Sequence, residues 1–298
     1  MATVTVKAEP RASGPQIVQT RRARISSHVL IYACLILFAL VLLFPFYWMA
    51  IVSIRPDKDL LNTKLNPFYP HHLTLKNYTH LIEDTQFLRW TWNTTFVAVC
   101  STALSLSASI CAGYALARLR FRGASSMGLG LFLAYLVPPT LLFLPLSQVV
   151  NNLHLGNSYW ALILTYPTFL IPFGSWLLMG YFRSIPRELE ESAMIDGASR
   201  WQAMTRIVLP LAMPGILSAG IFSFTLSWNE FLYSLIFMST TKMKTLPVGA
   251  VSELIRGDVF FWGSLMAAAL IGSVPVAIAY SFFVENYVAG LTAGSVKG

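Results

Sequence analysis

The chain has 298 residues, of which 55% are hydrophobic and only 11% are charged, and its net charge is +8. A soluble globular protein has about 25% charged residues, so this composition excludes an ordinary soluble domain and indicates a polytopic membrane protein. The basic surplus does not indicate nucleic-acid binding, because the aromatic residues lie inside the apolar runs and not among the basic residues.

The N-terminal segment is polar and basic. Four arginines lie ahead of the first apolar run: Arg11, Arg21, Arg22 and Arg24. We expect residues 1–28 to form a disordered cytoplasmic tail, because they hold too few apolar side chains for a core. The apolar run that follows is too long for the hydrophobic part of a cleavable signal peptide, which favours a retained first span. Residues 29–298 then form one predicted transmembrane domain.

Six apolar segments are long enough to cross a membrane. A helix needs about 20 mostly apolar residues to span about 30 Å of hydrocarbon. The segments are Val29–Ile54, Trp92–Leu116, Met127–Val150, Tyr159–Tyr181, Gly215–Phe237 and Gly263–Val288. They predict an all-α polytopic membrane protein with six transmembrane helices.

Several of these spans are not uniform apolar helices. Small residues recur at four-residue spacing in the second span, as at Ser105 and Ser109, and permit close approach of another helix. Prolines interrupt the third and fourth spans, at Pro138, Pro139, Pro145, Pro167 and Pro172. The breaks serve either packing alone or a moving, cavity-lining part of the protein. The sequence leaves both interpretations open.

Basic residues in the connections predict the orientation, because cytoplasmic loops are enriched in Lys and Arg. With the N-terminus inside, the cytoplasmic segments are 1–28, 117–126, 182–214 and 289–298. These segments hold thirteen of the 21 Lys and Arg, and the cluster at 118–122 is the clearest single indication. The outer loop 55–91 has five basic residues and four acidic residues, which weakly indicates the opposite orientation. The balance predicts both termini in the cytoplasm.

The outer loop 55–91 is too polar to lie in lipid. It is expected to form a small ordered cap with short helices, for example around Tyr78–Leu88. The loop also contains the motif Leu75-Lys76-Asn77-Tyr78.

The connection 182–214 is a polar island between two apolar runs and is predicted to fold as two short helices at the membrane face. Strong helix formers at 187–196 follow Pro186, which suits a first helical turn. Gly197 suits the end of that helix, and Ser199 suits the start of a second helix. Pro210 and Pro214 are expected to stop the second helix before the fifth span. The island is either an amphipathic surface element without a partner or a docking surface.

The island also carries a family motif. The run Glu191-Ser192-Ala193-Met194-Ile195-Asp196-Gly197, followed by Ile207-Val208-Leu209-Pro210, resembles the signature loop of permease subunits of bacterial ABC importers. The family usually has Glu-Ala-Ala where this chain has Ser192 in the middle, a small-for-small change. The resemblance implies a type I ABC importer permease fold. It also implies that five residues couple the chain to an ATPase: Glu191, Ser192, Ala193, Asp196 and Gly197.

The end of the chain, Gly290-Leu291-Thr292-Ala293-Gly294-Ser295-Val296-Lys297-Gly298, resembles the tail of the smaller permease in the maltose-type branch of sugar importers. The resemblance implies that Thr292, Ala293 and Gly294 contact the ATPase. It further implies four kinds of partner: a second homologous permease, two ATP-binding subunits, an extracytoplasmic solute-binding protein and a sugar. The expected location is the bacterial inner membrane.

A polar triplet, Trp228-Asn229-Glu230, lies inside the otherwise apolar fifth span and also resembles the maltose-type branch. A charge at membrane depth is costly unless it faces a cavity or a partner group. Carboxylate and amide acceptors beside an aromatic face suit a hydroxyl-rich solute, which makes the triplet a candidate for the substrate path. The alternative is a hydrogen bond between helices.

The chain lacks the motifs of an enzyme. No Gly-x-x-x-x-Gly-Lys-Ser/Thr loop, His-Glu-x-x-His, Cys-x-x-Cys or Gly-x-Ser-x-Gly occurs. We expect no bound metal or cofactor, with ATP and magnesium on the partner ATPase. The predicted function is the permease subunit of an ATP-driven sugar importer. The alternative is a secondary transporter driven by an ion gradient, which usually has ionisable residues in several spans and internal repeats.

Overall fold

The computed structural model describes the backbone of residues 21–292 and the side chains of residues 28–282. The chain divides into two units, residues 1–48 and 49–298. Most of the predicted tail 1–28 and the predicted contact residues Ala293 and Gly294 lie outside the described residues. The described part of the first unit is the larger part of helix α1 (Arg21–Ser53), which contains a segment of mean hydropathy 2.9. This value suits a span in lipid.

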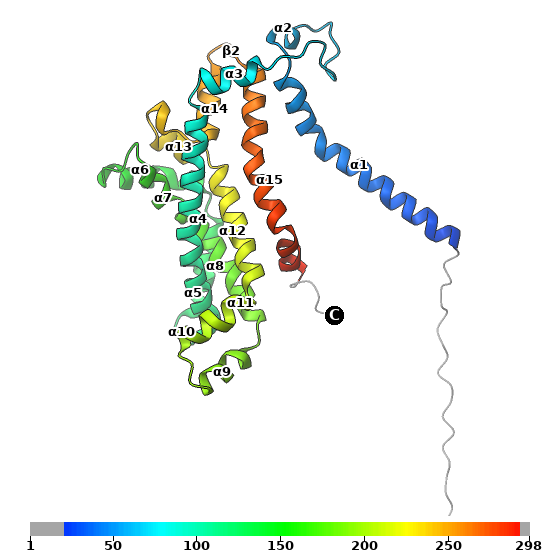
Figure 1. The fold of residues 1–298 in the computed structure, drawn as a ribbon. Helices are drawn as coiled ribbons and strands as arrows, with labels where there is room; N and C mark the ends of the chain where they lie inside the picture. The colour runs from blue at the N-terminus through cyan, green and yellow to red at the C-terminus, as the bar shows by residue number, and fades with distance from the viewer. Residues whose placement is uncertain (1–20, 293–298) are drawn as a thin grey trace, which may run out of the picture. The chain divides into compact units, whose positions relative to one another are not determined.

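The second unit is built of helices (Figure 1). They are α2 (Asp57–Leu60), α3 (Lys76–Glu83), α4 (Phe87–Arg118), α5 (Ala124–Leu136), α6 (Pro139–Asn152), α7 (Tyr159–Thr165), α8 (Pro167–Ser184), α9 (Arg187–Ile195), α10 (Arg200–Ala203), α11 (Leu209–Leu211), α12 (Met213–Trp228), α13 (Leu232–Phe237), α14 (Leu246–Leu254) and α15 (Trp262–Thr292). A π-helical turn, η1 (Met204–Val208), joins α10 to α11, and a 3₁₀ turn, η2 (Thr241–Met243), precedes α14.

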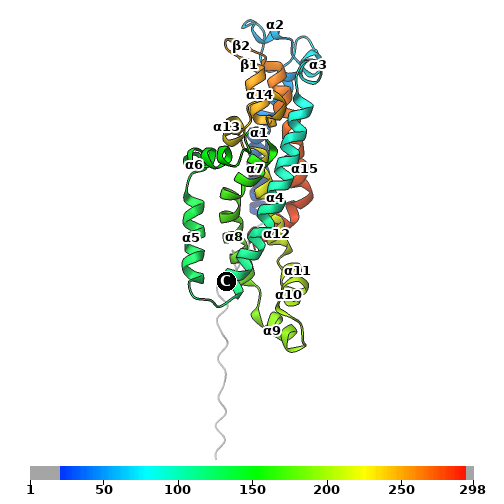
Figure 2. The ribbon, with the colours of Figure 1, turned by 90° about the vertical axis from the view of Figure 1, so that its left-hand side faces the viewer.

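A short antiparallel hairpin, β1 (Ile255–Arg256) and β2 (Val259–Phe260), lies before α15 and pairs Ile255 with Phe260. Neither α14 nor this hairpin was predicted. Along the second unit, α3, α14 and the hairpin lie at one end, and α9 and α10 lie at the other (Figures 1 and 2).

Helix α4 is the central element of the second unit and packs on α8 and α12. Its contact with α8 is very close, because a Cβ atom added at Gly174 would lie 2.6 Å from Ser109 Oγ. Ser105 and Ser109 are both buried. The predicted close approach through small residues of the second span is therefore confirmed.

Four helical segments among the described residues are long and apolar enough to cross a membrane, and there are up to six if each of two bent pairs is one span. The third span is interrupted at its prolines as predicted, whereas the prediction of an unbroken fifth span was wrong. The third is broken between α5 and α6 by a 96° bend, since Pro138 and Pro139 interrupt the helical hydrogen bonding. The fifth ends at Trp228, and α13 begins only at Leu232.

Asn77 on α3 is hydrogen-bonded to the end of α1 and to the segment that follows it. Its Nδ2 donates to the carbonyl oxygens of Ser53 and Arg55, each at 2.8 Å. Gly263 lies against the Asn77 amide, where an added Cβ would come within 2.2 Å. The predicted helix around Tyr78–Leu88 was misplaced: α3 spans Lys76–Glu83, and α4 begins at Phe87 after a break. Within the motif Leu75-Lys76-Asn77-Tyr78, Asn77 therefore has a structural role.

Candidate functional site

The polar island 182–214 folds as the predicted pair of short helices. Gly197 has φ +90°, a left-handed conformation that ends α9 and that side chains other than glycine rarely adopt. Ser199 starts α10 with a reciprocal pair of hydrogen bonds: Gln202 N donates to Ser199 Oγ at 3.2 Å, and Ser199 N donates to Gln202 Oε1 at 2.8 Å. This capping box fixes the direction in which the chain leaves the turn.

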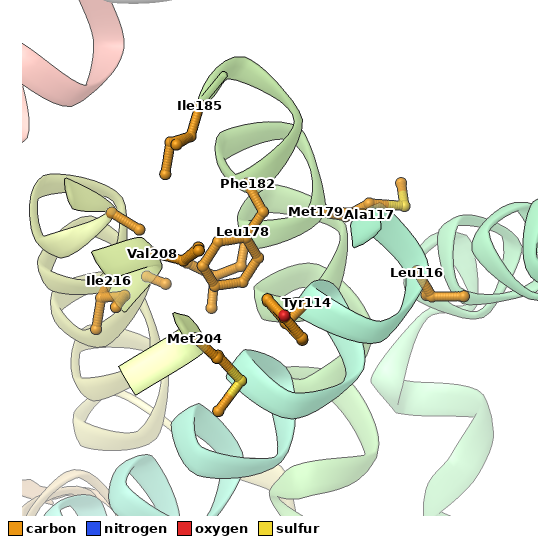
Figure 3. Close-up of a cluster of buried hydrophobic side chains, with 12 residues drawn as sticks. Tyr114, Leu116, Ala117, Leu178, Met179, Phe182, Ile185, Met204, Val208 and Ile216 are labelled. Atoms are coloured by element: carbon orange, nitrogen blue, oxygen red, sulfur yellow. The ribbon is translucent and has the colours of Figure 1, made fainter. Parts of the chain in front are cut away.

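The second half of the island rests on the ends of three long helices. Met204 and Val208 of η1 are buried in a cluster with side chains of α4, α8 and α12, among them Phe182 (Figure 3). The second helix stops before the fifth span as predicted from Pro210 and Pro214, although Pro210 itself lies inside the helical segment. The chain stays helical through Leu211 and bends by 76° before α12, where Pro214 occupies the first turn. The second half of the island is thus in direct contact with the ends of α4, α8 and α12.

The first half of the island presents an exposed surface. Glu191, Ser192, Asp196 and Gly197 are exposed, and Ala193 is half-buried. The structure brings these five predicted coupling residues together on α9 and its turn. It adds two large apolar side chains that sequence reasoning did not single out: Ile195 is 85% exposed and Trp201 is 65% exposed. We define these seven residues as the docking surface.

The predicted substrate-path triplet lies at the break between α12 and α13, and its three side chains have different surroundings. Trp228 is buried, and its Nε1 donates to Gly272 O on α15 at 3.0 Å. Asn229 is exposed, and its Nδ2 donates to Thr225 O at 2.9 Å. Glu230 is half-buried and turns toward α13 and toward Tyr166 between α7 and α8. Of the three, only Asn229 offers an exposed polar side chain.

The Glu230 carboxylate holds the break together. Oε1 accepts from Tyr233 N at 2.8 Å, and Oε2 accepts from Ser234 N at 3.2 Å and from Tyr166 Oη at 3.0 Å. The first two bonds satisfy N–H groups at the start of α13 that have no partner within the helix. The geometry therefore agrees with the interhelical hydrogen bond that the sequence left open beside the path role.

Three helix breaks meet at this point. Tyr166 lies between α7 and α8, and it donates to Glu230 at the break after α12. Tyr233 Oη donates to Pro139 O at the break between α5 and α6, at 3.2 Å. Sequence reasoning missed Tyr166 and Tyr233, and no local signal could find them, because they bond to residues 64 and 94 positions away. We call Tyr166, Tyr233, Glu230 and Pro139 the break junction.

The predicted ATPase-contacting tail is only partly placed. Thr292 is the last residue of α15, and its side chain lies outside the described residues, as do Ala293 and Gly294. Its contact with an ATPase stays a prediction.

These features define a class of membrane protein. Residues 108–292 match the family described as binding-protein-dependent transport system inner membrane component, and the chain belongs to this family. The matched range includes α8, the whole island and the triplet. The fold also agrees with an importer solved by crystallography, a bacterial ABC transporter for the acidic polysaccharide alginate: the TM-score is 0.73 with 20% identity, over 91% of this chain and 99% of that chain.

The chain is similar to several curated permease proteins over nearly its whole length. One is the sulfoquinovosyl glycerol transport system permease protein SmoH of Agrobacterium fabrum, 40% identical over 86% of this chain and 89% of that protein. Another is the trehalose/maltose transport system permease protein MalG of Thermococcus litoralis, 34% identical over 93% and 99%. A third is the diacetylchitobiose uptake system permease protein DasC of Streptomyces coelicolor, 34% identical over 86% and 92%.

Proposed function

We propose that this chain is a permease subunit of an ATP-driven carbohydrate importer, with the docking surface seated on a separate ATP-binding subunit. The observation that carries the proposal is the geometry of the island: α9 offers an exposed face, and η1 is packed on the ends of α4, α8 and α12. A force applied to this face reaches three long helices. The family match and the sugar-importing relatives support the same function.

The partners follow from this function. A second homologous permease completes the path, two ATP-binding subunits hold ATP and magnesium, and a solute-binding protein delivers the solute from outside. A solved alginate importer with 16% identity and a TM-score of 0.62 was crystallised with its periplasmic binding protein. The proposed location is the bacterial inner membrane, with the island in the cytoplasm, where ATP is available. This orientation agrees with the basic residues of the connections.

The solute class is a short glycoside, because the similar permease proteins serve trehalose and maltose, diacetylchitobiose or sulfoquinovosyl glycerol. The proposed path residues are the triplet Trp228, Asn229 and Glu230. Asn229 presents the exposed polar group to the solute, while Trp228 and Glu230 hold the break in shape. Transport proceeds by alternating access: closure of the ATP-binding subunits moves the docking surface, and the long helices reorient.

Co-purification tests this function directly. The tagged chain, expressed together with its neighbouring genes, is expected to retain an ATP-binding subunit and a second permease. Proteoliposomes of this complex are expected to take up a radiolabelled disaccharide, such as trehalose or maltose, only with ATP inside and binding protein outside. Uptake that follows an imposed ion gradient without ATP would instead support a secondary transporter. A chain that transports without an ATP-binding partner would contradict the proposal.

A further inference from the structure

A buried polar cluster joins α9 to the end of the second span. Glu190 lies on α9, and Tyr114 and Arg118 lie in the last two turns of α4; at most 6% of each residue is exposed. Tyr114 Oη donates a hydrogen bond to Glu190 Oε1. Arg118 Nε lies 3.6 Å from Glu190 Oε2. We call these three residues the α4–α9 cluster. They lie side by side although 72 positions separate Arg118 from Glu190 in the sequence.

Two further bonds tie the same elements through their backbones. Arg118 Nη2 donates to Ile185 O at 2.8 Å, just before α9. In the opposite direction, Arg187 Nη2 donates to Ala117 O at 3.0 Å. The first turn of α9 and the last turn of α4 therefore carry side-chain bonds that run both ways. Since Arg118 also stands at the C-terminal end of α4, its charge is favourable there for α4 itself.

The α4–α9 cluster lies on the inward face of α9, whereas most of the docking surface is exposed. Glu190 and the half-buried Met194 are four residues apart and face inward, whereas Ser192 and Ile195 are three apart and exposed. One face of α9 is thus held by α4, and the other is free for a partner. Burying charges costs solvation energy that apolar packing avoids, so a buried ion pair is better suited to fixing a defined geometry than to stability alone.

We propose that Glu190, held by Arg118 and Tyr114, is the positioning residue through which movement of α9 is passed to α4. The inference rests on the proposed coupling function and deepens it: the docking surface receives the movement, and the α4–α9 cluster delivers it to the second span. Apolar contacts alone would let α9 slide across α4. Directed hydrogen bonds and a charge pair keep the two elements in register.

Hydrogen–deuterium exchange in the assembled complex tests the inference without knowledge of the solute. The permease–ATPase complex in lipid nanodiscs is compared with and without ATP plus orthovanadate, which traps the closed ATP-binding subunits. In the wild type, exchange is expected to change both at α9 and at the last turn of α4, where Leu119 N bonds to Ala115 O. In Glu190→Gln, the change at α9 is expected to remain, while the change at α4 falls about tenfold.

Two variants complete the design. Tyr114→Phe keeps the ring and removes only the hydroxyl donor, so it is expected to show a smaller loss and to serve as the test if Glu190→Gln does not assemble. Glu188→Gln is the matched control, because Glu188 is an exposed glutamate on the same helix, and its exchange is expected to follow the wild type.

The outcomes separate the inference from the function on which it rests. The inference would be overturned if both Glu190→Gln and Tyr114→Phe showed the same exchange change at α4 as the wild type. It would also be overturned if variants that still fold lost the ATP-binding subunit, because the cluster would then serve docking. Trapping that changes exchange at α9 but not at α4 in the wild type would overturn it as well. No change at α9 in the wild type would remove the coupling function itself.

Discussion

Replacing Gly197 with aspartate is expected to lower ATP-driven uptake about 100-fold while ATP hydrolysis by the complex continues. Gly197 has φ +90°, and nothing in this chain lies within 4 Å of a Cβ placed there. The new side chain would therefore strain the turn after α9 and project toward the partner as an unpaired charge. Uptake and ATP hydrolysis are measured together in proteoliposomes, and the amount of solute taken up per ATP hydrolysed is expected to fall.

Gly123→Asp is the matched control for this variant. Gly123 also has a left-handed conformation, φ +88°, with nothing within 4 Å of an added Cβ. It lies in the short connection between α4 and α5, outside the docking surface. Backbone strain is therefore similar in the two variants, and Gly123→Asp is expected to keep uptake within about threefold of the wild type. Equal loss in both would assign the Gly197 effect to strain, and normal uptake by Gly197→Asp would remove the coupling assignment.

Glu230→Ala is expected to destabilise the protein more than any other single substitution at the break junction. It would leave Tyr233 N, Ser234 N and the buried Tyr166 hydroxyl without their acceptor. An unsatisfied buried polar group costs about 1–3 kcal/mol, so a loss of at least about 3 kcal/mol is expected from the three groups together. Thermal melting of the purified complex in detergent, followed by tryptophan fluorescence, should show a clear decrease in the melting temperature.

Two neighbouring variants show which hydrogen bonds account for this loss of stability. Tyr166→Phe removes one of the three hydrogen bonds and is expected to cost about 1 kcal/mol. Asn229→Ala removes only the bond to Thr225 O from an exposed side chain, so it is expected to melt as the wild type does while uptake falls. Glu230→Ala with an unchanged melting temperature and reduced uptake would reverse these roles and make Glu230 a direct contact of the solute.

Local signals in the sequence predicted the island well. Gly197, Ser199 and Gln202 act within a few residues of one another, and the turn they specify does not depend on distant parts of the chain. The exposure of Ile195 and Trp201 was not predicted, because a helical pattern alone does not show which apolar side chains have a neighbour to cover them. The membrane class followed from composition, which tertiary packing does not change.

The helix breaks were predicted only in part. Pro138 and Pro139 indicate an interruption, but the 96° angle depends on contacts such as that of Tyr233 with Pro139. The break after Trp228 was missed because an apolar run continues on both sides of it. Glu230 was treated as a charge inside a helix, whereas it accepts hydrogen bonds from the start of the next helix. Contacts that join distant residues, such as Glu190 with Arg118, are set by packing and not by local pattern.

Site-directed cross-linking tests the central claim most directly. A cysteine placed at the exposed Ser192, in a chain without Cys34, Cys100 and Cys111, is labelled with a photoreactive maleimide, and Thr79→Cys in α3 at the opposite end of the unit serves for comparison. Illumination of the complex is expected to join Ser192→Cys, and not Thr79→Cys, to the ATP-binding subunit. An adduct formed only by Thr79→Cys, or none at Ser192→Cys in a complex that retains its ATP-binding subunit, would contradict the account.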